Sequence, residues 1–154
     1  MATMEKEQVA VTIPAAYLED VRSALAKEIK MDGDALRADQ AKLVAAVGAR
    51  DIEFHRDDRD GAADSLSQDV RLLEQLHNAT GDTKLTGEAG SLAHTLEATV
   101  RVLCGRLKDV CQYGPLPMGD VIELSSRLRW GADEAIRIYP GLYHPRPSDD
   151  EAVA

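Results

Sequence analysis

Apolar side chains that recur at helical spacing constrain the fold of this chain more strongly than any other feature. In residues 91–113 they recur at intervals of four, three, four and three positions, at Leu96, Val100, Leu103, Leu107 and Val110. This spacing places them on one face of a helix, as a narrow stripe suited to pairing with a second helix. Because such a stripe must be buried, the sequence predicts a protein of helices packed against one another.

Other segments repeat this rhythm between turn signals. We predict further helices over residues 14–30, from 35 to about 60, over 62–78 and over 120–139. Glycine favours turns, so the predicted breaks are Asp32-Gly33-Asp34, Asp60-Gly61 and a loop over residues 80–90. The alternative for the second of these helices is an earlier end, with Ile52 and Phe54 in a short extended segment.

The N-terminal segment shows a different pattern. Val9, Val11 and Ile13 occupy alternate positions, which is typical of a short strand, and Pro14 follows as a suitable first residue of a helix. We therefore divide the chain into an N-terminal arm (1–13), a helical bundle domain (14–140) and a mobile C-terminal tail (141–154). The predicted fold is all-α, an antiparallel bundle of four to five helices with room for a short N-terminal strand.

The charge balance excludes several kinds of partner. Among 154 residues there are 27 acidic and 18 basic side chains, which gives a formal net charge of −9. A net negative surface repels phosphate, so nucleic acid is an unlikely partner and docking on anionic membranes is disfavoured. No apolar run approaches the length of a membrane span and the N-terminus is polar, so we expect a cytoplasmic protein.

The two cysteines lie in one predicted helix. Cys104 and Cys111 are seven positions apart, which separates their Cα atoms by about 10 Å at the helical rise per residue. That distance is too long for a disulfide. We interpret both as small buried apolar residues.

One residue pair has the spacing of a metal site. Glu74 and His77 form a Glu-x-x-His pair, which is the ligand pair of ferritin-like carboxylate bundles that bind iron. A complete site would need a second copy of the chain and a further carboxylate, Glu28 or Glu53. With so many acidic residues such a spacing arises easily by chance, so an ordinary surface pair is the favoured interpretation and iron the alternative.

Two other polar groups have simpler interpretations. The acidic segment from Glu53 to Asp60 is interleaved with arginines, and we interpret it as a solvated, salt-bridged helix face. His94 lies three positions before Glu97, which is typical of an exposed helix residue with a local partner. No catalytic motif of recognisable spacing occurs, so the sequence assigns no catalytic residue.

Residues 8–48 resemble a ribbon-helix-helix DNA-binding unit, in which a strand is followed by two helices. That resemblance implies an obligate dimer formed through the strand, acting as a regulator. The side chains that would face the DNA groove are Gln8, Ala10 and Thr12, and none of them is basic. This departure weakens the resemblance where DNA binding depends on it.

The sequence is most consistent with a non-enzymatic, self-associating module for protein–protein interaction or assembly. Its candidate contact residues are the seam leucines Leu96, Leu103 and Leu107. A second candidate is the basic flank of the last helix, formed by Arg127, Arg129 and Trp130. The alternatives are the dimeric metal-carboxylate protein, the ribbon-helix-helix regulator and a small-ligand sensor.

Overall fold

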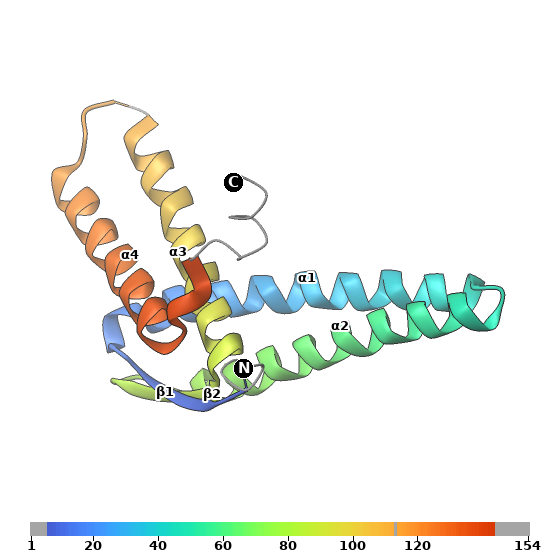
Figure 1. Cartoon of the computed structure of the whole chain (residues 1–154). Coiled ribbons are helices and arrows are strands. Elements are labelled where there is room, and N and C mark those ends of the chain that lie inside the picture. Colours follow the sequence, from blue (N-terminus) through green and yellow to red (C-terminus); the bar gives the residue numbers. More distant parts are fainter. Residues whose placement is uncertain (1–5, 113, 144–154) are drawn as a thin grey trace, which may run out of the picture.

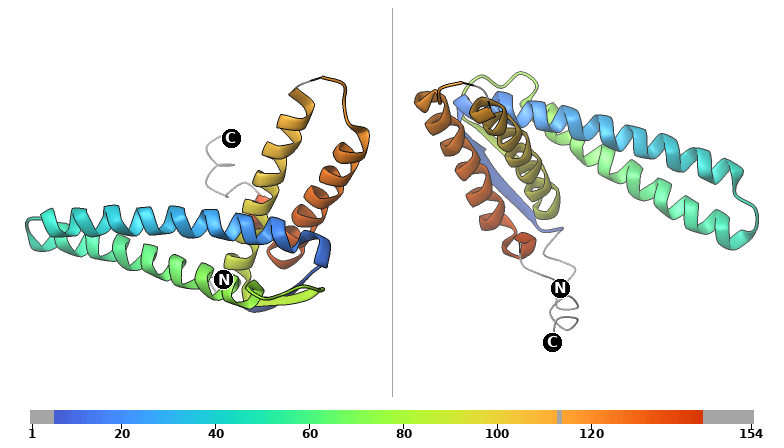
Figure 2. Two further views of the ribbon diagram at one scale, coloured as in Figure 1. Left: turned by 180° about the vertical axis from the view of Figure 1, so that it is seen from behind. Right: turned by 90° about the horizontal axis from the view of Figure 1, so that it is seen from above.

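The chain folds into two helical hairpins that point in different directions from a small two-stranded sheet (Figures 1 and 2). This computed structural model describes residues 6–112 and 114–143. The elements in chain order are β1 (Gln8–Ile13), η1 (Ala15–Tyr17), α1 (Leu18–Ala45), α2 (Ala49–Leu76), β2 (Thr83–Glu88), α3 (Ala89–Gln112), α4 (Met118–Ile138) and η2 (Pro140–Tyr143). Most of the predicted C-terminal tail, residues 144–154, lies outside the described residues.

The first hairpin consists of two helices of 28 residues each, so the breaks predicted at Gly33 and Gly61 are wrong. A glycine inside a helix costs only about 1 kcal/mol relative to alanine, which long flanking helical segments overcome. The single helix predicted from residue 35 to about 60 is wrong, because α1 ends at Ala45 and α2 begins at Ala49. Residues 50–60 are nevertheless helical, as part of α2, so the extended alternative for Ile52 and Phe54 is also wrong. The turn lies instead at Gly48, whose φ of 91° is a conformation that favours glycine.

The predicted N-terminal strand is confirmed, and it pairs with a strand that the sequence analysis missed. β1 runs antiparallel to β2, with Val11 opposite Leu85 and both side chains buried. The loop predicted over residues 80–90 is therefore wrong from Thr83 onward, because β2 is followed directly by α3 at Ala89. Because β2 contains a single large apolar residue, its alternation gives no signal until β1 lies beside it.

The hydrophobic core lies where the base of the first hairpin meets the sheet and the start of α3. α1 contributes Leu25, α2 contributes Leu76, and β1 contributes Ile13, each with no exposed surface. Leu92 and Leu96 extend the same cluster along α3, while Ala135 and Ile138 join it from α4. The core thus occupies one end of α1 and α2 and leaves their other end outside it.

The second hairpin, formed by α3 and α4, matches the predicted helices over 91–113 and 120–139 within a few residues. Its helices approach closely at Gly131, where an added Cβ atom would lie 3.0 Å from Cγ2 of Val100. Glycine thus suits this packing, because a side chain at position 131 would crowd the Val100 side chain of α3.

A buried aspartate ties the two hairpins together. Asp20, near the start of α1, is 2% exposed and accepts bonds from Arg106 of α3 at 2.7 Å and Arg127 of α4 at 3.2 Å. The Arg127 guanidinium also lies over the Tyr17 ring, whose centroid is 5.1 Å from that of Trp130. One carboxylate therefore links three helices beside an aromatic pair.

We expect glycine substitutions to have opposite effects in the two hairpins. Gly33→Ala should raise the free energy of unfolding by about 0.5–1 kcal/mol, because nothing lies within 4 Å of the added methyl group. Gly131→Leu should lower it by about 1–3 kcal/mol through overpacking against Val100. Urea denaturation measures both changes, and a stabilising Gly131→Leu would contradict the close approach of α3 and α4.

Asp20→Asn should lower the free energy of unfolding by about 1–3 kcal/mol, because two charge-assisted hydrogen bonds lose their anion. Glu19→Gln is the matched control, since the Glu19 side chain is 79% exposed and, within the described part of the chain, forms an ion pair only with Arg22 of its own helix. Thermal denaturation of both variants tests this link, and equal melting temperatures would show that it contributes nothing.

Candidate interaction surface and carboxylate cluster

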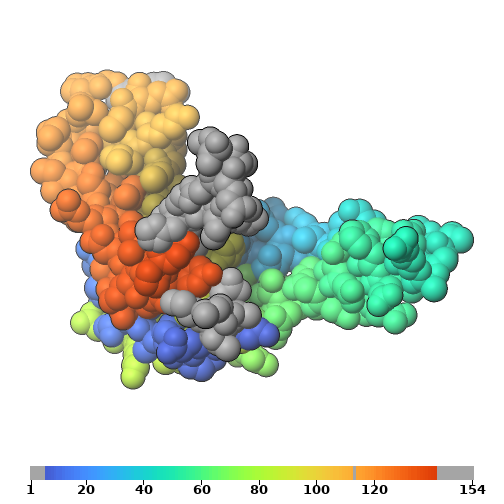
Figure 3. Space-filling view, viewed as in Figure 1, coloured from blue at the N-terminus to red at the C-terminus, as the bar shows by residue number. Residues whose placement is uncertain are grey.

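The far part of the first hairpin projects from the molecule without a core of its own. No residue from Ile29 to Gln68 is buried, although the structure describes all of them. We call residues 29–68 the outer hairpin. Figure 3 shows it extending to one side of the body.

The outer hairpin nevertheless carries two groups of apolar side chains, which differ in how far they are exposed. Those between its helices are half-buried, at Ile29, Leu36, Leu43, Ile52 and Leu66. Outside this seam, Val44, Val47 and Phe54 are 77%, 86% and 61% exposed. Two helices can cover only one side of each other, so the seam is left open on its flanks.

The surface around these apolar side chains is charged, with acidic residues in excess. The outer hairpin holds nine acidic and six basic side chains, a net charge of −3. Arg59 bonds the Asp60 carboxylate at 2.9 Å and reaches Gln40 of α1. This ion pair lies on the helix face that was predicted to be solvated and salt-bridged.

At the base of the outer hairpin, three helices bring acidic groups and a histidine together. Glu28 and Asp32 lie one turn apart on α1, Asp69 faces them from α2, and His94 approaches from α3. The His94 Nε2 atom lies 3.0 Å from Glu28 Oε2, and Asp69 hydrogen-bonds Asp32. Glu28 is 8% exposed and Asp69 is 5% exposed. We call these four residues the carboxylate cluster.

The surroundings of Asp69 strongly favour its neutral form. Burial raises the pKa of Asp69 from 3.8 to about 8, and the hydrogen bond and charge of Asp32 and the charge of Glu28 act in the same direction. Two carboxyl groups can hydrogen-bond each other only when one of them carries a proton. Near neutral pH, Asp69 therefore supplies a donor between the two helices.

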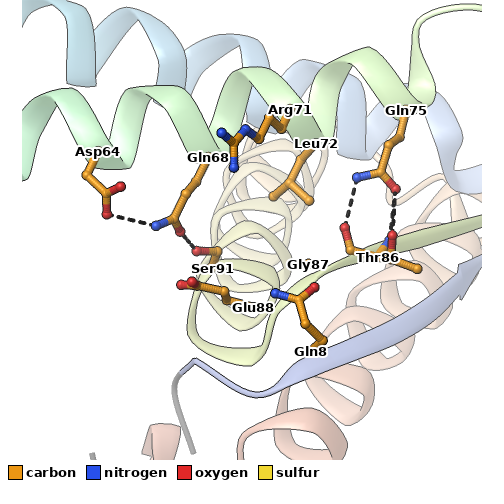
Figure 4. A pocket seen from close by; sticks show the side chains of 10 residues that line it. All are labelled: Gln8, Asp64, Gln68, Arg71, Leu72, Gln75, Thr86, Gly87, Glu88 and Ser91. Carbon is orange, nitrogen blue, oxygen red and sulfur yellow. Dashed lines mark hydrogen bonds between the residues drawn. The ribbon is translucent and has the colours of Figure 1, made fainter. Parts of the chain in front are cut away.

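Two cavities open beside this cluster. One, of about 370 Å³, is lined by Asp32, Ser65, Gln68, Asp69, Gly90, Ser91, His94 and Tyr139. The other, of about 220 Å³, lies between α2 and β2 and shares Gln68 and Ser91 with the first (Figure 4). In that view Ser91 donates to Gln68, which in turn donates to Asp64, so polar side chains form the wall between the cavities.

No known protein family, curated protein or solved structure matches this chain. In the structure itself, the described residues contain no group of three or more His, Cys, Asp or Glu side chains arranged to hold a metal ion. Among the described helices, none has the length and apolar character to cross a membrane. A functional proposal for this chain therefore rests on its own geometry alone.

The predicted contact residues occupy different environments. Leu96 and Leu103 are 2% and 1% exposed inside this chain, and Leu107 is half-buried between α3 and α4. In the basic flank, Arg127 bonds Asp20, Trp130 packs on Tyr17, and Arg129 is exposed. Leu96 belongs to the hydrophobic core of this chain. Arg129 is thus the most accessible of these candidates.

The predicted metal pair lies apart from the carboxylate cluster. Glu74 and His77 are exposed and line a shallow hollow at the end of α2, together with Val70, Leu73 and Asn78. Glu28, a proposed third ligand, hydrogen-bonds His94 instead. The iron site would need a second chain, so it stays a prediction.

Two further expectations are corrected. Cys104 and Cys111 are exposed, because both lie on the face of α3 outside its buried seam, so their interpretation as buried residues is wrong. The ribbon-helix-helix resemblance fails at its second helix, because α1 continues unbroken through Gly33 to Ala45. Its strand pairs with β2 of the same chain.

We expect Asp69→Asn to change how stability depends on pH. Between pH 3.8 and about 8 the folded state holds a proton on Asp69 that the unfolded state releases. The free energy of unfolding of the native chain should therefore fall as pH rises through this window, then level off. The variant lacks this contribution, so its stability relative to the native chain should increase with pH.

Urea denaturation across this pH range measures the difference. Asp58→Asn makes the same chemical change on an exposed part of α2 and should leave the native pH profile intact. Parallel profiles for Asp69→Asn and the native chain would contradict the raised pKa of Asp69.

Proposed function

We propose that this chain is a non-enzymatic, self-associating helical assembly module in which two copies pair their outer hairpins. The observation that supports this is the absence of any buried residue between Ile29 and Gln68 in a segment that nonetheless forms two long helices. Helices in proteins depend mainly on packing of an apolar face rather than on intrinsic propensity. A partner that covers the open seam supplies that packing.

The exposed apolar side chains indicate how much a partner would stabilise the hairpin. Full burial of a valine or phenylalanine side chain contributes about 1.5–3 kcal/mol. Val44, Val47 and Phe54 each expose more than half of their surface, and the half-buried seam lies beside them. Covering these groups in two chains at once would contribute enough to hold a pair together against the cost of association.

A second copy is the occupant that best fits this surface. An antiparallel pair of helices lacks the other half of a four-helix bundle, and an identical hairpin supplies two helices of the same length. A two-fold axis brings each apolar side chain against its equivalent surface. Basic residues such as Arg56 and Arg59 lie among the acidic ones, so ion pairs can form across such an interface. Four helices, two from each copy, would then form an antiparallel bundle between the chains.

Removing the exposed apolar groups should dissociate the pair. In light scattering, the native chain of 16.7 kDa should show about twice this mass. The double variant Val44→Ser, Phe54→Ser should weaken association by at least about tenfold through lost apolar burial. The chain should keep its helical circular dichroism, because the core at the base is unchanged.

Ile122→Ser is the matched control, because Ile122 is 60% exposed on α4, far along the chain from the outer hairpin. It should leave the mass unchanged. Dissociation by Ile122→Ser but not by the double variant would place the contact on the second hairpin instead. A native chain that is monomeric at high concentration would overturn the proposal outright.

Salt should strengthen the self-association. Each outer hairpin carries a net charge of −3, so two copies repel each other and added salt screens this repulsion. Sedimentation at rising salt concentration should show a falling dissociation constant. Weaker association at higher salt would contradict this repulsion and indicate that ion pairs across the interface hold the two copies together.

A further inference from the structure

The carboxylate cluster lies at the point where the outer hairpin leaves the core. Glu28 is the last buried residue of α1, and Asp69 is the first buried residue of α2. Beyond them, the two helices meet through the half-buried seam and the contact of Arg59 with Gln40, and none of the residues there is buried. The direction of the outer hairpin therefore depends on the contacts that this cluster makes among α1, α2 and α3.

The groups that face Asp69 provide little positive charge. From α1 it meets Glu28 and Asp32, and from α3 His94 approaches Glu28. Tyr139, which lies between α4 and η2, and Ser65 and Gln68 of α2 complete the adjoining cavity. Among the described residues, no lysine or arginine lines this cavity. His94 is thus the nearest group that can become cationic, and its side chain is 54% exposed.

A proton is therefore required to keep α1 and α2 together at this level. With one proton between them, Asp32 and Asp69 attract each other through a hydrogen bond. Without it, two anions face each other next to Glu28, and like charges in a partly buried site repel strongly. The cavity of about 370 Å³ beside them gives water a route to the proton.

We propose that the carboxylate cluster is a proton-dependent latch that holds the outer hairpin in its position relative to the core. Resting on the proposed self-association, the latch makes assembly sensitive to pH. Loss of the proton separates α1 from α2 at the base of the outer hairpin and displaces the surface that binds the second copy.

The latch can be tested within one chain by pulsed electron spin resonance. One spin label is attached to the exposed native Cys104 of α3 in a Cys111→Ser background, and the other to Ala45→Cys at the end of α1. Dilution with unlabelled full-length chain restricts the signal to distances within one molecule. The distance should be narrowly distributed near pH 6 and should broaden or shift above the Asp69 pKa of about 8.

Variants separate the latch from other effects of alkaline pH. Asp69→Asn should remove the transition, because an amide keeps a hydrogen-bond donor at every pH. Asp32→Asn should move the transition to lower pH, since the opposing charge is lost, while Asp58→Asn should retain the native behaviour. A native distance that does not change with pH, or a transition that persists in Asp69→Asn, would overturn the latch.

A separate measurement tests the link to assembly. If only the latched chain associates, the fraction of each chain that can associate should fall about tenfold between roughly pH 7 and pH 9. The dissociation constant of the native pair should rise accordingly, and Asp69→Asn should flatten this rise. A pH-dependent distance in a chain that never associates would reject the proposed function but retain the latch. Association that ignores pH while the distance changes would reject the coupling. Millimolar Mg²⁺ that shifts the transition would identify a cation site in place of the latch.

Discussion

The confinement of the hydrophobic core to one end of α1 and α2 determines most properties of this molecule. Leu25, Leu76 and Leu92 pack together at the base, where the sheet and α3 close the core. A domain of this length can bury a substantial core, yet the part of the chain in the outer hairpin contributes nothing fully buried to it. The same uneven distribution places the carboxylate cluster at a boundary, with packed side chains on one side and open helices on the other.

Helical periodicity in the sequence was sufficient to predict the helices but not their ends. The seam from Leu96 to Val110 correctly predicted α3, because regular intervals survive any tertiary arrangement. Gly33 and Gly61 were misread as turns, since glycine inside a helix and glycine at its end look alike in a single sequence. β2 was missed because its strand character depends on pairing with β1, which lies more than seventy residues earlier.

The carboxylate cluster could be found only in part from sequence. Glu28 lies in the first predicted helix, but Asp32 falls in the break predicted after it, and only the unbroken α1 places these two acidic groups, four positions apart, on the same face. Their partners Asp69 and His94 are distant along the chain, and His94 was assigned to its neighbour Glu97. Sequence reasoning favours local partners because it cannot see which helices meet. The exposed groups on the outer hairpin were equally hidden, since periodicity identifies an apolar face without showing whether anything covers it.

The projection of the outer hairpin gives it the properties of a lever. From Ile29 to Ala45, α1 extends about 25 Å beyond the core at the helical rise per residue. A rotation of about 10° at the base would therefore carry the tip near Gly48 through about 4 Å, close to the diameter of a methyl group. Adjustments of a few tenths of an ångström among the side chains that anchor α1 thus become displacements comparable with a whole packing layer at the far end.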